Sequence, residues 1–117
     1  MSPKPIFWVG GALDDLRSFP DEVRRMAGHE LHLVQLGLLP SDWKPMPTVT
    51  AGVREIRIHS GAEHRVFYVA NFPEGIYVLH AFEKRSRRTR RADMALAKQR
   101  LRDVLRHRRD HSSRQQG

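Results

Sequence analysis

The sequence predicts an α+β domain: a twisted, mostly antiparallel sheet of four strands with two N-terminal helices and one C-terminal helix. Three runs rich in β-branched and aromatic residues, 53–58, 65–72 and 75–82, are joined by connections short enough for hairpins. Apolar residues on either side of this meander recur at helical spacing. By length the chain is one domain, which we place at 1–107, with 108–117 as a disordered, polar and basic tail.

The N-terminal third supplies one strand and two helices. Ile6–Val9 is a short apolar run that ends at two glycines, which is typical of a strand. Residues 12–19 predict a short helix. Pro20 then opens a longer helix as its first residue, where its missing N–H costs nothing. Met26 belongs to the apolar stripe of this helix, so we expect it in the core, and Gly37 is a suitable stop.

The rest of the chain continues the pattern. Residues 38–52 contain three prolines and predict a loop. In the meander, alternation places Arg65, Phe67 and Val69 on one face of their strand, and it groups Val78, His80 and Phe82 on one face of the next. After the meander, Thr89 can cap a helix that runs to about Arg106.

The charge is concentrated in one region. The net charge is +8, but residues 84–117 hold 13 Lys or Arg against three acids, whereas residues 1–83 carry −2. A one-sided positive field favours a polyanionic partner and speeds encounter with it. The alternative interpretation is a solvated basic tail.

Several classes of site are not expected. The chain has no cysteine, which excludes disulfides and thiolate metal sites, and no apolar run approaches the roughly 20 residues of a membrane helix. His29 and His32 are three residues apart but have no evident third ligand, so we predict no metal. We expect no cofactor, no membrane contact and a cytoplasmic location.

Cations cluster where the last strand gives way to the last helix. The cluster consists of Lys84, Arg85, Arg87, Arg88, Arg90 and Arg91. Arg90 and Arg91 have the wrong sign for a helix N-terminus, where acids are favourable. Cations beside free backbone N–H groups form an anion site, which indicates phosphate binding.

The sequence resembles the RelE/ParE superfamily of toxins from type II toxin–antitoxin systems, and within it the phage-derived, HigB-like branch. The resemblance covers roughly residues 5–106 and depends on the order of several segments. These are Asp14–Pro20, Gln35–Gly37, Glu55–Arg57, Arg65–Tyr68 and Val78–Arg85.

This resemblance implies a ribosome-dependent endoribonuclease that cuts mRNA without a metal, the ribose 2′-OH attacking the adjacent phosphate. Such a protein positions the hydroxyl, stabilises the phosphorane charge and moves protons. Arg65 and Arg85 match family catalytic arginines, with Lys84 beside the second. Arg57 is expected nearby, and it would bind RNA or the ribosome together with Arg87, Arg88, Arg90 and Arg91.

The proton-transfer groups differ from the family pattern. Val53 and Glu55 stand where lysines are usual, and 87–91 stands where a C-terminal tyrosine is usual. His80 is the first substitute because imidazole titrates near neutral pH. Its alternative is a partly buried strand histidine with a hydrogen-bond partner. The weaker candidates are Tyr68, Tyr77, Glu55 and Glu83.

The resemblance also implies partners and alternatives. The partners would be the ribosome, its mRNA and a cognate antitoxin, expected as a helix-turn-helix protein that supplies the contacts to operator DNA. One alternative is a ParE-like poison of DNA gyrase, against which convergence of Arg65 and Arg85 would argue. The other is a non-catalytic, RNA-binding phage remnant.

Overall fold

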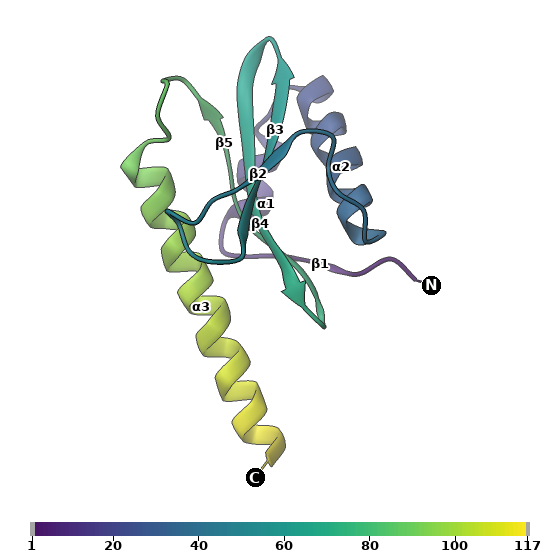
Figure 1. Cartoon of the computed structure of the whole chain (residues 1–117), viewed down its shortest axis with the longest axis vertical. Helices are drawn as coiled ribbons and strands as arrows, with labels where there is room; N and C mark the ends of the chain where they lie inside the picture. The colour runs from purple at the N-terminus through teal and green to yellow at the C-terminus, as the bar shows by residue number, and fades with distance from the viewer. Residues whose placement is uncertain (1, 117) are drawn as a thin grey trace.

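The computed structural model describes residues 2–116 and confirms the α+β class. Figure 1 shows a central sheet with α1 and α2 on one face and α3 on the other. The five strands follow the order β1-β5-β4-β3-β2. The elements are β1 Ile6–Trp8, α1 Ala12–Arg17, α2 Asp21–Gln35, β2 Trp43–Pro45, β3 Val53–Ser60, β4 Ala62–Phe72, β5 Gly75–Lys84 and α3 Arg91–Gln116.

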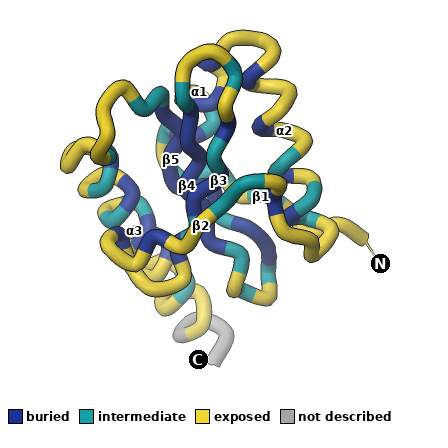
Figure 2. The backbone as a smooth tube through the Cα atoms, turned by 45° about the horizontal axis from the view of Figure 1, so that its top comes forward, coloured by how far each residue is buried: buried dark blue, intermediate teal, exposed yellow. Residues whose placement is uncertain are grey.

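Each face of the sheet carries its own apolar core, and the central strands are the most buried part of the chain (Figure 2). On one face, α1 and α2 pack against residues that include Ile56, Val66 and Tyr68. On the other face, α3 packs against residues that include Phe67 and Leu79. The central strands are buried from both sides because they alternate between these two cores.

The fifth strand corrects the predicted sheet of four. Trp43–Pro45 lies in the expected loop but pairs antiparallel with β3 as an edge strand, a position that tolerates proline. At the opposite edge, β1 pairs with β5 in parallel, while β3, β4 and β5 form the expected antiparallel meander. The mostly antiparallel character is therefore confirmed.

A β-bulge corrects the predicted faces of β5. Phe67 pairs with His80, but its neighbour Tyr68 pairs with Val78, so Leu79 is an extra residue on β5. The alternation on β5 is shifted there. As a result Val78 packs in the core beneath α1 and α2, whereas Phe82 packs beneath α3. The predicted faces of β4 are confirmed.

Two predicted helix details are also wrong. Met26 is 37% exposed, because the buried stripe of α2 follows Val23, Ala27, Leu31 and Val34. The last helix begins at Arg91, after Thr89, and continues through 108–116, which we expected as a disordered tail. Gly117 lies outside the described residues.

A cation anchors the second half of α3 to the sheet. The Nε atom of Arg108 donates to Glu74 at 2.6 Å, and its guanidinium lies 4.0 Å from the centroid of the Phe72 ring. The Arg108 partner lowers the pKa of Glu74 to about 2. Beyond this contact α3 extends past the sheet (Figure 1).

Gly75 is required where β1 approaches β5. A β-carbon at this position would lie 2.6 Å from the carbonyl oxygen of Pro5 and 2.8 Å from the ring of Phe7. We expect Gly75→Ala to displace β1 and lower the free energy of unfolding by about 1–3 kcal/mol, the usual cost of overpacking.

Gly28 provides the matched control, because a β-carbon there meets no atom of the described chain within 4 Å. Gly28→Ala should stabilise α2 by about 0.5–1 kcal/mol through helix propensity. Urea denaturation of both variants tests the pair. Equal effects would show that the backbone of β1 does not constrain residue 75.

Candidate functional site

Charged side chains from four adjacent strands meet on the α3 side of the sheet. Pairing sets Lys44 of β2 opposite Glu55 of β3, Arg57 opposite Arg65 of β4, and Glu63 of β4 opposite Lys84 of β5. We call these six residues the sheet cluster. Neighbouring strands lie about 4.8 Å apart, so side chains at paired positions are within reach of each other.

Arg65 is the buried centre of the sheet cluster, with 2% of its side chain exposed. Its Nη1 donates to the carbonyl oxygen of His64 at 3.0 Å, and its Nη2 donates to Glu63 at 3.1 Å. Its Nε lies 3.5 Å from an oxygen of Glu55. A buried guanidinium needs such partners, so Arg65 holds the two carboxylates in place and presents little surface to a ligand.

Glu55 is also buried, with 1% exposed, and it faces several cations. One oxygen lies 3.5 Å from Nε of Arg65 and 3.6 Å from Nε of Arg57. Burial raises the pKa of Glu55 above its ordinary value of 4.5, and the surrounding cations, Arg65 first, oppose the rise.

The sheet cluster leaves buried polar atoms without hydrogen bonds. Within the described chain, neither oxygen of Glu55 accepts one, and the Nε atoms of Arg57 and Arg65 donate none. Native proteins pair most such groups, so the concentration of unpaired atoms on this face makes the sheet cluster the candidate functional site.

Three cations of the sheet cluster reach solvent. Lys44 is exposed, the side chain of Arg57 is 31% exposed, and Lys84 is partly exposed. Burial lowers the pKa of Lys84 below its ordinary value of 10.5, and the charge of Arg65 lowers it further. A lysine with a lowered pKa is suited to proton transfer, whereas arginine remains charged.

His59 adds an exposed extension at the tip of the β3–β4 hairpin. Its Nδ1 contacts Glu63 at 2.7 Å, and its Nε2 contacts Asp42. These hydrogen bonds, Asp42 first, raise the pKa of His59, while His59 lowers the pKa of Glu63. Glu63 therefore links this imidazole to Arg65.

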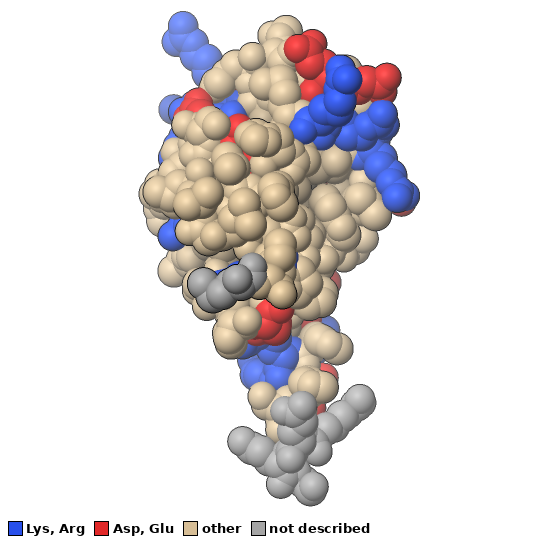
Figure 3. Space-filling model, turned by 90° about the vertical axis from the view of Figure 1, so that its right-hand side faces the viewer, with Lys and Arg blue, Asp and Glu red and all other residues tan. Residues whose placement is uncertain are grey.

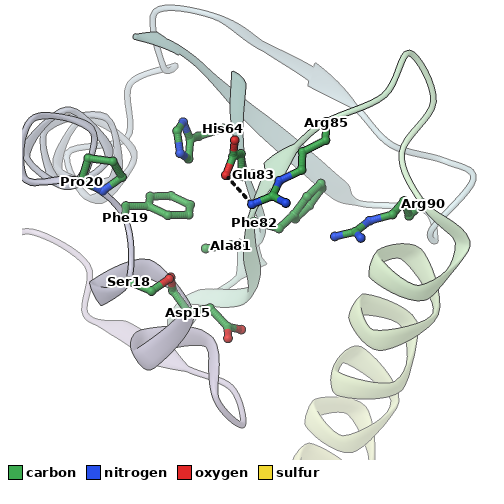
Figure 4. Close-up of a pocket in the computed structure, with 10 residues that line it drawn as sticks. All are labelled: Asp15, Ser18, Phe19, Pro20, His64, Ala81, Phe82, Glu83, Arg85 and Arg90. Carbon is green, nitrogen blue, oxygen red and sulfur yellow. Dashed lines mark hydrogen bonds and ion pairs between the residues drawn. The ribbon is translucent and has the colours of Figure 1, made fainter. Parts of the chain in front are cut away.

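Arg85 does not join the sheet cluster. It lines a separate hollow of about 420 Å³ together with Asp15, Glu83 and Arg90 (Figure 4). Its Nη2 contacts Glu83 at 3.2 Å, and its side chain is 75% exposed. The expected pairing of Arg65 with Arg85 is therefore wrong. Lys84 lies with Arg65 instead, because consecutive strand residues point to opposite faces.

The remaining cations surround the start of α3. Arg90 lies 3.3 Å from Asp93 through its Nε. Arg87 and Arg88 occupy the exposed loop between β5 and α3, and Arg91 is the exposed first residue of the helix. Together with Arg85 they form a cationic rim, which follows Lys84 of the sheet cluster directly in the sequence.

His80 has its ring nitrogens directed at carboxylates of two helices. Nε2 lies 2.7 Å from Asp93 of α3, and Nδ1 lies 3.3 Å from Asp15 of α1. Arg100 joins the same network through Asp15, at 3.0 Å. This geometry matches the alternative interpretation of His80 as a partly buried strand histidine with hydrogen-bond partners.

The other proton-transfer candidates also lie away from the sheet cluster, except Glu55. Tyr68 is fully buried in the core beneath α1 and α2, and this burial raises its pKa. Tyr77 donates to Glu74 at 2.8 Å, and burial raises its pKa to about 12. Glu83 pairs with Arg85.

Lys44 and Glu63 were missed at the sequence level. Lys44 lies on the unpredicted strand β2, where only its place between Trp43 and Pro45 hinted at an edge strand. Glu63 falls in the predicted hairpin connection, but β4 begins one residue earlier, at Ala62. A two-residue alternation from Arg65 back to Glu63 was the available signal.

Two further kinds of feature are absent from the described residues. No helix among them is long and apolar enough to cross a membrane. No group of three or more His, Cys, Asp or Glu side chains within residues 2–116 is arranged to hold a metal ion.

Comparison with known proteins identifies one family. A family model described as "Phage derived protein Gp49-like (DUF891)" matches residues 14–102. Among solved structures, the chain is similar to one in the toxin–antitoxin complex RelBE2 from Mycobacterium tuberculosis. The identity is 20% and the TM-score 0.48, over 70% of this chain and 99% of that one. No curated protein sequence matches significantly.

Proposed function

The chain belongs to the phage-derived Gp49-like family, and we propose that it is the toxin of a type II toxin–antitoxin system that cleaves mRNA on the ribosome. The observation that carries this proposal is the sheet cluster. It combines solvent-facing cations, a lysine with a lowered pKa and buried polar atoms without partners. Positioned cations and a proton donor of lowered pKa are the groups that a metal-independent phosphoryl transfer uses.

The sheet cluster supports a division of roles. Arg57 and Lys44 face solvent and would bind the scissile phosphate, where arginine's fixed charge stabilises the phosphorane. Lys84 would donate a proton to the departing 5′-oxygen as the 2′-oxygen bonds to phosphorus and the bond from phosphorus to the 5′-oxygen breaks, while the proton of the 2′-OH passes to water. Arg65 and Glu55 are too buried to touch RNA, so we assign them as positioning residues.

This division changes the roles expected from the resemblance. Arg65 becomes a positioning residue, and Lys84 replaces His80 as the proton-transfer group. Arg85 moves with Arg87, Arg88, Arg90 and Arg91 to a docking role toward RNA. Because Arg65 and Arg85 do not converge, a gyrase poison stays the second candidate, and mapping of mRNA ends distinguishes the two targets.

The partners follow from the proposed activity. They would be the ribosome with its mRNA, and an antitoxin that blocks the toxin. A helix-turn-helix antitoxin encoded beside the toxin would supply the contacts to operator DNA. Its removal would expose the sheet cluster to the ribosome.

The first test is 5′-end mapping of cellular mRNA after brief induction, with wild type and Lys84→Ala compared at equal protein levels. New ends in register with codons, seen only with the wild type, are the expected result. Growth arrest without new ends would overturn the proposal in favour of gyrase. Neither arrest nor new ends would favour a binding remnant.

The negative charge of Glu55 should set the pKa of the proposed proton donor, Lys84. The nearby carboxylate raises the pKa of Lys84 and partly offsets the effect of burial. In Glu55→Gln that support is lost, so the pKa of Lys84 falls further. Cleavage that requires protonated Lys84 declines as pH rises through its pKa. The alkaline limb of the pH–rate profile should therefore move to lower pH in this variant.

Cleavage of ribosome-bound mRNA measured across alkaline pH gives this profile, with Glu83→Gln as the control on the opposite face. If Glu55 acted only structurally, Glu55→Gln would lower the cleavage rate but leave the alkaline limb of the pH–rate profile at its original pH. An unmoved limb would therefore contradict the coupling between Glu55 and Lys84.

A further inference from the structure

The outward side of α3 carries a row of cations outside the sheet cluster. The row consists of Arg91, Lys98, Arg102, Arg106 and Arg109. At about 100° per residue these positions fall within an arc of about 80°, over about 27 Å of helix. The opposite side of α3 is buried through Ala97, Leu101 and Val104. In the row, Lys98 is partly exposed and the four arginines are exposed.

No carboxylate neutralises this row. None of its five members forms a salt bridge with an acid among the described residues. The nearby acids Asp103 and Asp110 fall about 40° or more outside the arc by helical geometry. By contrast, the face over α2 is largely uncharged across its middle (Figure 3). The positive field of this chain is therefore directed outward from α3.

The spacing of the row fits a nucleic-acid backbone. From Lys98 to Arg109, successive cations rise by about 4.5–6 Å along the helix axis. Phosphates on one strand of double-stranded DNA repeat about every 3.4 Å along its axis, and an A-form RNA helix spaces them at least as closely along its axis. Each long cationic side chain can therefore reach a different phosphate. The exposed apolar residues of α3, Leu96 and Leu105, fall on opposite sides of the arc, so they do not form the apolar centre that a protein interface needs.

We propose that the outward face of α3 docks on a double-helical segment of ribosomal RNA and orients the sheet cluster toward the mRNA. The choice of ribosomal RNA rests on the proposed function, while the recognition of a duplex backbone rests on the row itself. Contact with phosphates alone would be independent of sequence. Figure 1 shows that α3 extends past the sheet, so its outer side is open to a large partner.

The test is a triple variant, Arg102→Gln, Arg106→Gln and Arg109→Gln, measured for binding to purified 70S ribosomes and to a 20-base-pair RNA duplex. Three lost phosphate contacts should weaken binding about 10- to 100-fold. They should also reduce the slope of log affinity against log salt by about 2–3. Circular dichroism checks the fold, since glutamine preserves helix propensity.

The matched control is Lys4→Gln, Arg17→Gln and Arg25→Gln, which removes the same charge from exposed positions outside α3. An equal loss in this control, or unchanged binding in the α3 variant, would overturn the inference. Weakened binding to an antitoxin alone would also overturn it, because the partner would then be an acidic protein.

Different results would overturn the proposed endonuclease activity and the proposed docking face. A wild type that binds ribosomes through α3 yet makes no new mRNA ends would overturn the endonuclease and leave the docking face standing. A triple variant that docks and cleaves like the wild type would overturn the docking face alone.

Discussion

Lys84→Arg is expected to lower mRNA cleavage by about 10²–10⁴-fold, the usual contribution of a positioned acid or base. The substitution keeps the positive charge but replaces an amine of lowered pKa with a group that does not release its proton. Ribosome binding should therefore survive while the chemical step fails. Single-turnover cleavage on programmed ribosomes separates the two effects.

Arg85→Lys is the control for this prediction, because Arg85 is the next residue in the chain but lies with Glu83 in the other hollow. It keeps the positive charge that the docking role requires, so it should leave the single-turnover cleavage step on bound ribosomes unchanged. If Arg85→Lys lost as much cleavage as Lys84→Arg, the reacting group would lie on the wrong face of β5 for our assignment.

Arg65→Ala is expected to lower the free energy of unfolding by about 3–5 kcal/mol, the cost of removing one partner from a buried ion pair. Glu55 would keep its burial but lose the closest of its cations. Urea denaturation at neutral pH measures the change. Loss of activity in this variant would reflect unfolding as much as chemistry.

Arg57→Ala is the matched variant, since Arg57 contacts the same oxygen of Glu55 at 3.6 Å but is 31% exposed. We expect it to cost only about 0–1 kcal/mol, as for surface pairs. The double variant Glu55→Leu with Arg65→Met should regain most of the stability, because it removes both buried charges. Equal losses for Arg65→Ala and Arg57→Ala would contradict the structural role of Arg65.

Local patterns in the sequence predicted much of this fold. The meander follows from three β-rich runs with short connections, and alternation correctly assigned both faces of β4. The same rule failed on β5, because the extra residue Leu79 shifts the pairing. A bulge depends on how two strands fit together, and a two-residue period contains no sign of it.

The candidate site was harder to predict for related reasons. Alternation alone separates Lys84 from Arg85, but the resemblance favoured pairing Arg85 with Arg65. Predicting Lys44 as a site residue requires recognising the edge strand Trp43–Pro45, and a strand of three residues is too short to give a periodic signal. His80 resembled a titrating base in sequence, yet its partners Asp15 and Asp93 come from helices far along the chain.

The parallel pairing of β1 with β5 has a consequence for folding order. Ile6 pairs with Ile76, so the N-terminal strand cannot find its place until most of the chain has been synthesised. The β3–β4–β5 meander pairs only segments that are neighbours in the sequence, so its contacts form faster. We therefore expect the meander, which carries most of the sheet cluster, to form before β1 closes its edge of the sheet.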